Sequence, residues 1–344
     1  MNTIFSKDEI IESAYNYFRN KPFTVKEYPA HLIMQEINAL AEIPIDKLKT
    51  ALTANQISNW YHQYRFKILC NNKPTVFESY HHPKRLLKAI KDIIENNRTI
   101  ENIIPLNYLV RVHGTQLAGK FRPGFVLYYI KKYCNISQPL KIMDTCLGYG
   151  SSLIAGLALN NLEYFIGIDA NSESYTGNVN MISALNREDY NHKIILYNDG
   201  LEYLHHLNSI HKNQIDFCIT SPPYYCNEKY SQDKKQSYLR YPLYADWLKG
   251  FLTPMLQLQY DTLKYGCFNI VNISNVVIDN IQYPLTENTI SIAEKLGFKL
   301  ILNENITTNT VNHSREKGVL KTFEPVLVFQ KTKKTFVPVK RKII

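Results

Sequence analysis

The sequence lacks the features that mark membrane, secreted and repeat proteins. No apolar run in its 344 residues approaches the roughly 20 residues that a membrane-spanning helix needs. The first residues, MNTIFSKDEI, have no basic stretch followed by an apolar one, so we expect no secretory signal. No internal repeat is present either. With 45% hydrophobic and 20% charged residues, the composition predicts a globular, cytoplasmic protein that does not associate with membranes.

Cysteine is too scarce and too scattered for a metal site or a disulfide framework. The six cysteines form no C-x-x-C pair, and no histidine cluster accompanies them. Zinc sites need such groups of ligands at short spacings, so we expect no bound metal. Cys146 and Cys218 lie in apolar, strand-like segments, and we interpret them as small buried side chains in a reducing cytoplasm.

Basic residues and tyrosines are abundant. The chain carries 40 Lys and Arg against 30 Asp and Glu, which gives a formal net charge of +10, and it contains 25 tyrosines. Positive charge interleaved with aromatic rings favours a nucleic-acid partner, because it offers stacking faces beside groups that neutralise phosphate. A lysine-rich composition inherited from an AT-rich genome would give the same charge, and the composition does not separate the two explanations.

The periodicity of apolar residues divides the chain into three regions. Residues 1–115 show helical spacing, as in HLIMQEINALAEI and PKRLLKAIKDIIENN, and predict a helical N-terminal domain that we consider a candidate for DNA recognition. Residues 116–335 alternate short strand-like runs with helices, which predicts a doubly wound, mainly parallel α/β sheet with one antiparallel edge. Residues 336–344 form a basic tail.

The first predicted strand of the sheet leads into a glycine loop. Strand LKIMD ends at Asp144 and is followed by Cys146, Gly148 and Gly150, after which the helix SSLIAGLAL begins. A Gly-x-Gly loop between a strand and a helix lets a ligand approach the backbone and exposes the free N–H groups of the helix start. A dinucleotide site would need a third glycine where Leu153 stands. Its absence favours a nucleoside cofactor without phosphates.

Acidic residues end the next two predicted strands. Asp169 is the last residue of YFIGID, and Asp199 directly follows KIILYN. A carboxylate at the first position can accept hydrogen bonds from both ribose hydroxyls, and one at the second can meet an adenine amino group. Asp144, Asp169 and Asp199 thus predict a cofactor cleft at one edge of the sheet. The alternative is that Asp169 and Asp199 merely cap helices.

A proline-stiffened turn follows the strand IDFCIT. Ser221, Pro222, Pro223 and Tyr224 leave the strand in a conformation that cannot continue a ladder. Such a turn can direct a hydroxyl and backbone carbonyls at one point beside a flat aromatic face. An exocyclic amine needs two acceptors for its hydrogens and a ring to stack on. The turn is therefore a candidate catalytic site for chemistry on a base amine, unless it is only a stiff loop.

These segments together resemble the DNA amino-methyltransferases. TSPPY at residues 220–224 looks like motif IV of that family, and DTCLGYG at 144–150 is similar to motif I, although Thr145 and Cys146 replace the usual Pro-Phe. Arg122 with Pro123 resembles motif X, and EPVLV at 324–328 looks like the last strand of the family. The resemblance spans residues 119–331. It implies a Rossmann-like methyltransferase sheet and S-adenosylmethionine as cofactor, with Arg122 added to the cofactor-binding residues.

The resemblance also implies a direct transfer of the methyl group to an exocyclic amine. The TSPPY form is usual for enzymes that methylate cytosine N4, so we expect that target in double-stranded DNA. The motif order X, I, IV places the cofactor half first, unlike many N4-cytosine enzymes, and keeps adenine N6 as the alternative. No Pro-Cys dipeptide of the kind used for ring-carbon methylation is present. Cys226 is therefore not expected to act as a nucleophile.

Residues around the turn are candidates for DNA contact. Tyrosines and basic residues alternate from residue 224 to 244, which suits a loop that clamps a flipped nucleotide. The candidates are Tyr225, Lys229, Lys234, Lys235 and Arg240, with Arg315 in a second polar loop. Methylation of RNA or of a protein amide, and an inactive nucleic-acid-binding subunit, remain alternatives. The sequence leaves open the recognition sequence, a cognate restriction enzyme in a restriction-modification system, and the oligomeric state.

Overall fold

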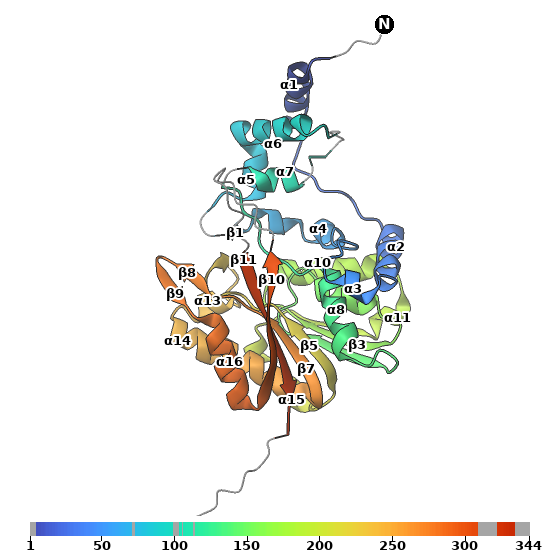
Figure 1. The fold of residues 1–344 in the computed structure, drawn as a ribbon, viewed down its shortest axis with the longest axis vertical. Helices are drawn as coiled ribbons and strands as arrows, with labels where there is room; N and C mark the ends of the chain where they lie inside the picture. The colour runs from blue at the N-terminus through green and yellow to red at the C-terminus, as the bar shows by residue number, and fades with distance from the viewer. Residues whose placement is uncertain are drawn as a thin grey trace, which may run out of the picture.

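The computed structural model describes residues 5–70, 73–98, 103–104, 106–112, 114–308 and 322–333. Its centre is a twisted seven-stranded sheet (Figure 1). The strands in spatial order are β10 (Phe298–Thr308), β11 (Thr322–Lys331), β7 (Leu263–Asn272), β5 (Ile215–Thr220), β2 (Leu140–Asp144), β3 (Leu162–Ile168) and β4 (Ile194–Tyr197). From β4 to β7 neighbouring strands are parallel, whereas β11 is antiparallel to both of its neighbours. The Rossmann-like sheet with an antiparallel edge is confirmed.

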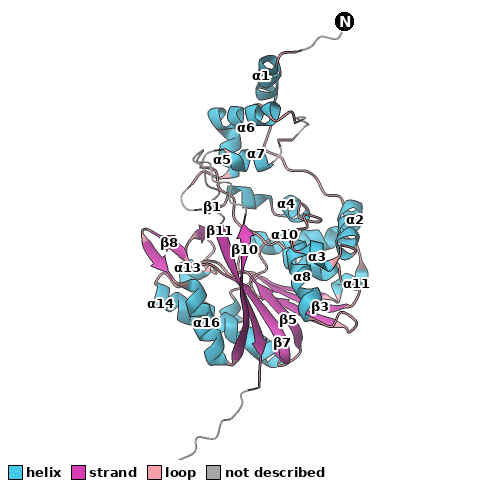
Figure 2. Cartoon of the chain, viewed as in Figure 1, coloured by secondary structure: helices cyan, strands magenta, loops and turns pink. Residues whose placement is uncertain are grey.

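Alternating side chains of the strands supply two hydrophobic cores, one on each face of the sheet. Ile142 and Phe217 belong to the first core, whereas their chain neighbours Met143 and Cys218 belong to the second. This alternation explains why the strands are apolar throughout: both faces are covered by helices, as Figure 2 shows. The first core includes α8 (Pro123–Tyr133), α9 (Ser151–Leu157) and α10 (Ser172–Ala184), and the second includes α12 (His206–Ile210), α15 (Thr253–Thr262) and α16 (Leu285–Leu296).

The N-terminal helices pack into two different cores. Helices α2 (Ala30–Ala41) and α3 (Ile45–Leu48) bury Ile33, Ile37, Leu40 and Leu48 in the first core of the sheet. A separate core is formed by α1 (Lys7–Phe18), α5 (Val76–His81), α6 (Pro83–Glu95) and α7 (Leu106–Arg111), which lie together beyond the end of the sheet (Figure 1). The packing thus joins α2 and α3 to the sheet, whereas the prediction assigned them to one N-terminal domain of residues 1–115.

A connecting segment ties the N-terminal region to the loop after the TSPPY turn. It contains α4 (Ile57–Tyr61), η1 (Gln63–Lys67) and β1 (Leu69–Cys70), and β1 pairs antiparallel with β6 (Glu228–Lys229). The remaining short elements are α11 (Glu188–Asn191), η2 (Leu201–Tyr203), α13 (Ser237–Arg240), α14 (Tyr244–Trp247), the π-helical turn η3 (Leu248–Leu252), and the hairpin of β8 (Val276–Ile278) and β9 (Ile281–Tyr283).

Two sequence predictions fall on residues outside the described ranges. They are the basic tail at 336–344 and the candidate DNA contact Arg315. Across the part of the chain that is described, we find no helix with the length and apolar character needed to cross a membrane.

Candidate active site

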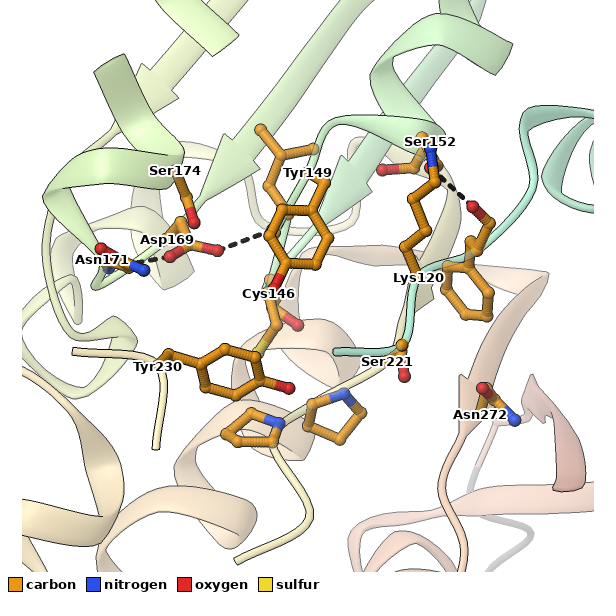
Figure 3. A pocket seen from close by; sticks show the side chains of 18 of the residues that line it. Lys120, Cys146, Tyr149, Ser152, Asp169, Asn171, Ser174, Ser221, Tyr230 and Asn272 are labelled. Atoms are coloured by element: carbon orange, nitrogen blue, oxygen red, sulfur yellow. Dashed lines mark hydrogen bonds between the residues drawn. The ribbon is translucent and has the colours of Figure 1, made fainter. Parts of the chain in front are cut away.

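A cleft of about 610 Å³ lies where β2, β3, β5 and β7 end. Connections after β2 and β5 leave toward opposite sides of the sheet, so this edge is the switch point at which α/β sheets bind ligands. Ten predicted site residues line the cleft together: Arg122, Cys146, Gly148, Asp169, Asp199, Ser221, Pro222, Pro223, Tyr224 and Lys235. The structure therefore brings the predicted cofactor loop and the predicted catalytic turn into one cavity, part of which is drawn in Figure 3.

Asp169 holds the glycine loop in place. Its carboxylate accepts the backbone N–H of Gly148 at 2.6 Å and that of Asn171 at 2.8 Å. Burial raises the pKa of Asp169 to about 6, although these two hydrogen bonds oppose the shift. Gly148 has a φ of 53°, a left-handed conformation that glycine adopts without strain. The carboxylate thus fixes the loop and still faces the cleft.

Asp144 and Gly150 lie beneath the loop rather than in the cleft lining. Asp144 is only 2% exposed and accepts the N–H of Cys146 at 3.0 Å and the hydroxyl of Ser152. Burial raises its pKa to about 6. Gly150 has a φ of 73° and begins α9, and an added Cβ would lie 2.1 Å from Oδ1 of Asn178. Both residues shape the loop, and neither lines the cleft. Their positions therefore do not support the predicted direct contact with a cofactor.

A nucleoside ligand fits the side of the cleft next to Asp169. The Nδ2 atom of Asn171 is buried there without a hydrogen-bond partner among the described residues. An unpaired donor beside a carboxylate that can accept suits ribose hydroxyls, which both donate and accept. Asp199 lines the same side. Tyr64 of η1 bonds the hydroxyl of Ser174, another lining residue, at 2.5 Å, so the N-terminal segment helps to enclose this region.

Asn272 braces the predicted catalytic turn, and the sequence did not indicate this residue. Its Oδ1 accepts the hydroxyl of Tyr224 at 3.4 Å, and its Nδ2 donates to the carbonyl of Pro325 at 2.9 Å. Asn272 therefore links the turn to β11 and also lines the cleft. The residue after the turn, Tyr225, has a φ of 58°, which is uncommon for a tyrosine. Local strain of this kind persists only when the surrounding structure holds it.

Two carboxylates, Glu228 and Glu324, also line the cleft and were not predicted. The carboxylate of Glu228 accepts the hydroxyl of Tyr230 and the N–H of Gly119 at 3.5 Å. Among the residues whose side chains the structure describes, none forms a hydrogen bond or an ion pair with the carboxylate of Glu324. Burial raises the pKa of both, and for Glu324 the nearby charge of Glu228 adds to the effect. The sequence placed Glu324 only in the predicted strand EPVLV, and no pattern in the sequence indicated a role for Glu228.

Lysine and arginine from the segment before α8 reach the cleft. Lys120 donates to the carbonyl of Asn55 and the hydroxyl of Ser58, and burial holds its pKa well below the ordinary value. Arg122 is the residue before Pro123, at which α8 begins. Arg122 was expected from motif X, whereas Lys120 was not.

The predicted DNA-binding residues separate into different environments. Tyr225 is only 5% exposed and packs against Tyr244, Trp247 and Tyr283, so its ring belongs to the core and not to a stacking surface. Arg240 forms an ion pair with Glu202. Lys235 donates to the carbonyl of Asn198 at 2.9 Å and lines the cleft. Lys229 and Lys234 are exposed. Some of the tyrosines and basic residues in this segment therefore pack within the protein and are not available to contact DNA.

Sequence comparison connects the region of the predicted catalytic turn with a known family. Residues 215–344 match the family model N6_N4_Mtase, described as DNA methylase. The matched stretch begins with the strand before the turn and includes β7, Asn272 and Glu324. No curated protein sequence matches the chain.

Solved structures with a similar arrangement are distant. TrmN from Thermus thermophilus is 12% identical over 62% of this chain and 50% of its own, with a TM-score of 0.38. The phosphoethanolamine N-methyltransferase 2 of Haemonchus contortus is 14% identical over 60% of this chain and 52% of its own, also at 0.38. The antibiotic-resistance methyltransferase Kmr is 11% identical over 64% of this chain and 97% of its own, again at 0.38. Likeness at this level carries no information about substrate.

Proposed function

We propose that this chain, whose residues 215–344 match a DNA methylase family model, methylates the exocyclic N4 amine of cytosine in double-stranded DNA. It is an S-adenosylmethionine-dependent methyltransferase, and the base and the polymer are the proposed part. One observation carries the proposal: the Ser221 turn and the Asp169 loop line a single cleft. Nucleophile and methyl donor must meet in one place for a direct transfer.

When bound, the cofactor supplies an electrophilic methyl group. Asp169 and Asn171 would hold its ribose, because an acceptor and an unpaired donor lie side by side there. The N–H of Gly148 is already engaged by Asp169, so the loop is ordered before a ligand arrives. Such preorganisation lowers the entropic cost of binding.

The turn would hold the target amine. The Ser221 hydroxyl and the carbonyl of Pro222 can each accept one amine hydrogen, which favours a pyramidal nitrogen whose lone pair is free to attack. Tyr224 offers a ring beside them, and its hydroxyl is fixed by Asn272. Burial raises the pKa of Cys146 and of Cys226, so both remain thiols at neutral pH. The protonated state of both thiols is consistent with a direct displacement that forms no covalent adduct with cysteine.

The choice of cytosine depends on Ser221, since the TSPPY form is typical of cytosine enzymes. Adenine N6 is the alternative, because both bases present an amine conjugated to a ring nitrogen. Double-stranded DNA as partner is supported by the net charge of +10 and by the exposed Lys229 and Lys234. Association with a cognate restriction enzyme remains a proposal without a structural feature to support it.

Nucleoside mass spectrometry tests the proposal. Genomic DNA from cells that express the protein is digested and compared with DNA from cells that express Ser221→Ala. We expect N4-methylcytosine only with the unaltered protein. N6-methyladenine as the sole new product would contradict the choice of base. Labelled methyl groups on RNA or protein, with none on DNA, would contradict the polymer.

A further inference from the structure

We propose that Glu324 is the base that takes the proton from the target amine during methyl transfer. The inference rests on the proposed function, because it concerns the amine held at the Ser221 turn. Glu324 lies two residues before Val326 on β11, in a different part of the chain from the turn, and both line the same cleft.

The sheet register places Glu324 on β11, two residues from the position that is level with Ser221. Thr220, the residue before Ser221, pairs with Val271 on β7, and Asn272 pairs with Val326 on β11. Ser221 is thus level with Val326, two strand spacings away, and Glu324 lies two residues further along β11, at roughly 12 Å from Ser221 between backbones. Both side chains line the cleft, so a target amine held at Ser221 would occupy the space that Glu324 also borders.

Asn272 keeps the two sides aligned. It occupies the strand between them and bonds Tyr224 on one side and the carbonyl of Pro325 on the other. Pro325 is the residue directly after Glu324, and its carbonyl also accepts the N–H of Ile273 at 3.3 Å. The backbone that carries Glu324 is therefore fixed relative to the turn.

The chemistry requires an acceptor that the turn does not contain. As the amine nitrogen bonds to carbon and the carbon–sulfur bond breaks, the nitrogen becomes positively charged and must lose a proton. Ser221 and the carbonyl of Pro222 are neutral and weakly basic, so they can accept hydrogen bonds but not a proton. Glu228 is already engaged by Tyr230 and Gly119. Glu324, which no described residue engages, can accept the proton and become a neutral carboxylic acid.

The environment of Glu324 suits a base. Its carboxylate is buried beside Glu228, and both conditions raise its pKa. A higher pKa makes the carboxylate a stronger proton acceptor, and its negative charge stabilises the positive charge that develops on nitrogen. Low pH would protonate Glu324 in advance and remove this capacity, so the rate of methyl transfer should rise with pH through the pKa of Glu324.

The test is the single-turnover rate at saturating cofactor and DNA, measured against pH for the unaltered protein, Glu324→Gln and Glu324→Asp. Glutamine keeps the size and hydrogen-bonding capacity but cannot take a proton. We expect Glu324→Gln to lower the rate about 100-fold and to abolish its rise with pH. Its affinities for cofactor and for DNA, measured by calorimetry, should stay within about twofold of the unaltered protein. Glu324→Asp retains a carboxylate and should keep the pH dependence at an intermediate rate.

The matched control is Glu163→Gln on β3, where Glu163 pairs with Lys141 at 3.1 Å away from the cleft. Its rate and pH profile should be unchanged. Unaltered rate and pH dependence in Glu324→Gln would overturn the proposal. Equal inactivity of both Glu324 variants together with weakened binding would overturn it too, since that result indicates a structural role. Failure of the unaltered protein to methylate any DNA amine would instead refute the proposed function.

Discussion

Removal of the Asp169 carboxylate should weaken cofactor binding in a pH-dependent way. Asp169→Ala deletes an acceptor for ribose hydroxyls and also frees the N–H groups of Gly148 and Asn171. A hydrogen bond to a charged group contributes about 1.5–3 kcal/mol. The desolvation that raises the pKa of Asp169 to about 6 offsets part of this hydrogen-bond free energy. We therefore expect affinity to fall by about 1–3 kcal/mol, or roughly 5-fold to 150-fold.

The raised pKa gives this prediction a second signature. Ribose hydroxyls donate best to the ionised carboxylate, so affinity should decline below pH 6, toward a limit of about tenfold per pH unit. The stability of the free protein changes in the opposite direction. The pKa of this buried carboxyl is about 6 in the folded protein and about 3.9 in the unfolded chain. The folded state therefore binds the proton more tightly, and the free energy of unfolding rises as pH falls from about 6 toward about 3.9. Weaker binding near pH 5 would therefore not reflect loss of structure through Asp169.

Isothermal titration calorimetry with S-adenosylmethionine or its demethylated product from pH 5 to pH 8 provides the assay. Asp169→Asn should bind with intermediate affinity and without the decline below pH 6, because an amide does not titrate. Asp246→Asn, an exposed position on α14, is the matched control and should behave like the unaltered protein. Equal affinities for Asp169→Ala and the unaltered protein at pH 7.5 would show that Asp169 does not contact the cofactor.

Three further outcomes are expected. Ser221→Ala should leave cofactor affinity nearly intact in calorimetry and lower turnover, and a collapse of that affinity would contradict the position of the turn. Gly150→Ala should lower the midpoint of thermal unfolding and the affinity for cofactor, because a φ of 73° disfavours a side chain and the added Cβ would lie 2.1 Å from Oδ1 of Asn178. Gly119→Ala is the control: an added Cβ there would have no atom within 4 Å, so the midpoint of thermal unfolding should not change. DNA affinity should fall steeply with salt as counterions are released, and a flat log–log plot would mean that the basic charge is incidental.

The sequence alone determined the sheet, the loop and the turn, because each depends on local rules. Apolar runs of strand length between amphipathic helices indicate a sheet covered on both faces, and the structure has its strands at those runs. Gly148 and Gly150 were recognisable because a turn between strand and helix needs left-handed backbone. Asp169 and Ser221 were recognisable because residues that end parallel strands meet at one edge of the sheet.

Only the tertiary structure decided which side chains face the cleft. Asp144 and Asp169 both end strands, yet Asp144 is turned beneath the loop by Ser152 and Cys146, and sequence spacing does not reveal that direction. Tyr225 directly follows the predicted catalytic turn, but its backbone is left-handed and its ring packs into the core.

Asn272 and Glu324 enter the site from β7 and β11, more than fifty residues and more than one hundred residues after Ser221 respectively. No periodicity links such distant positions. Strand pairing brings them within reach of the turn, since β7 lies between β5 and β11 in the sheet. Short sequence motifs thus identified the glycine loop and the TSPPY turn of the cleft. The order of the strands in the sheet determined that Asn272 and Glu324 also line it.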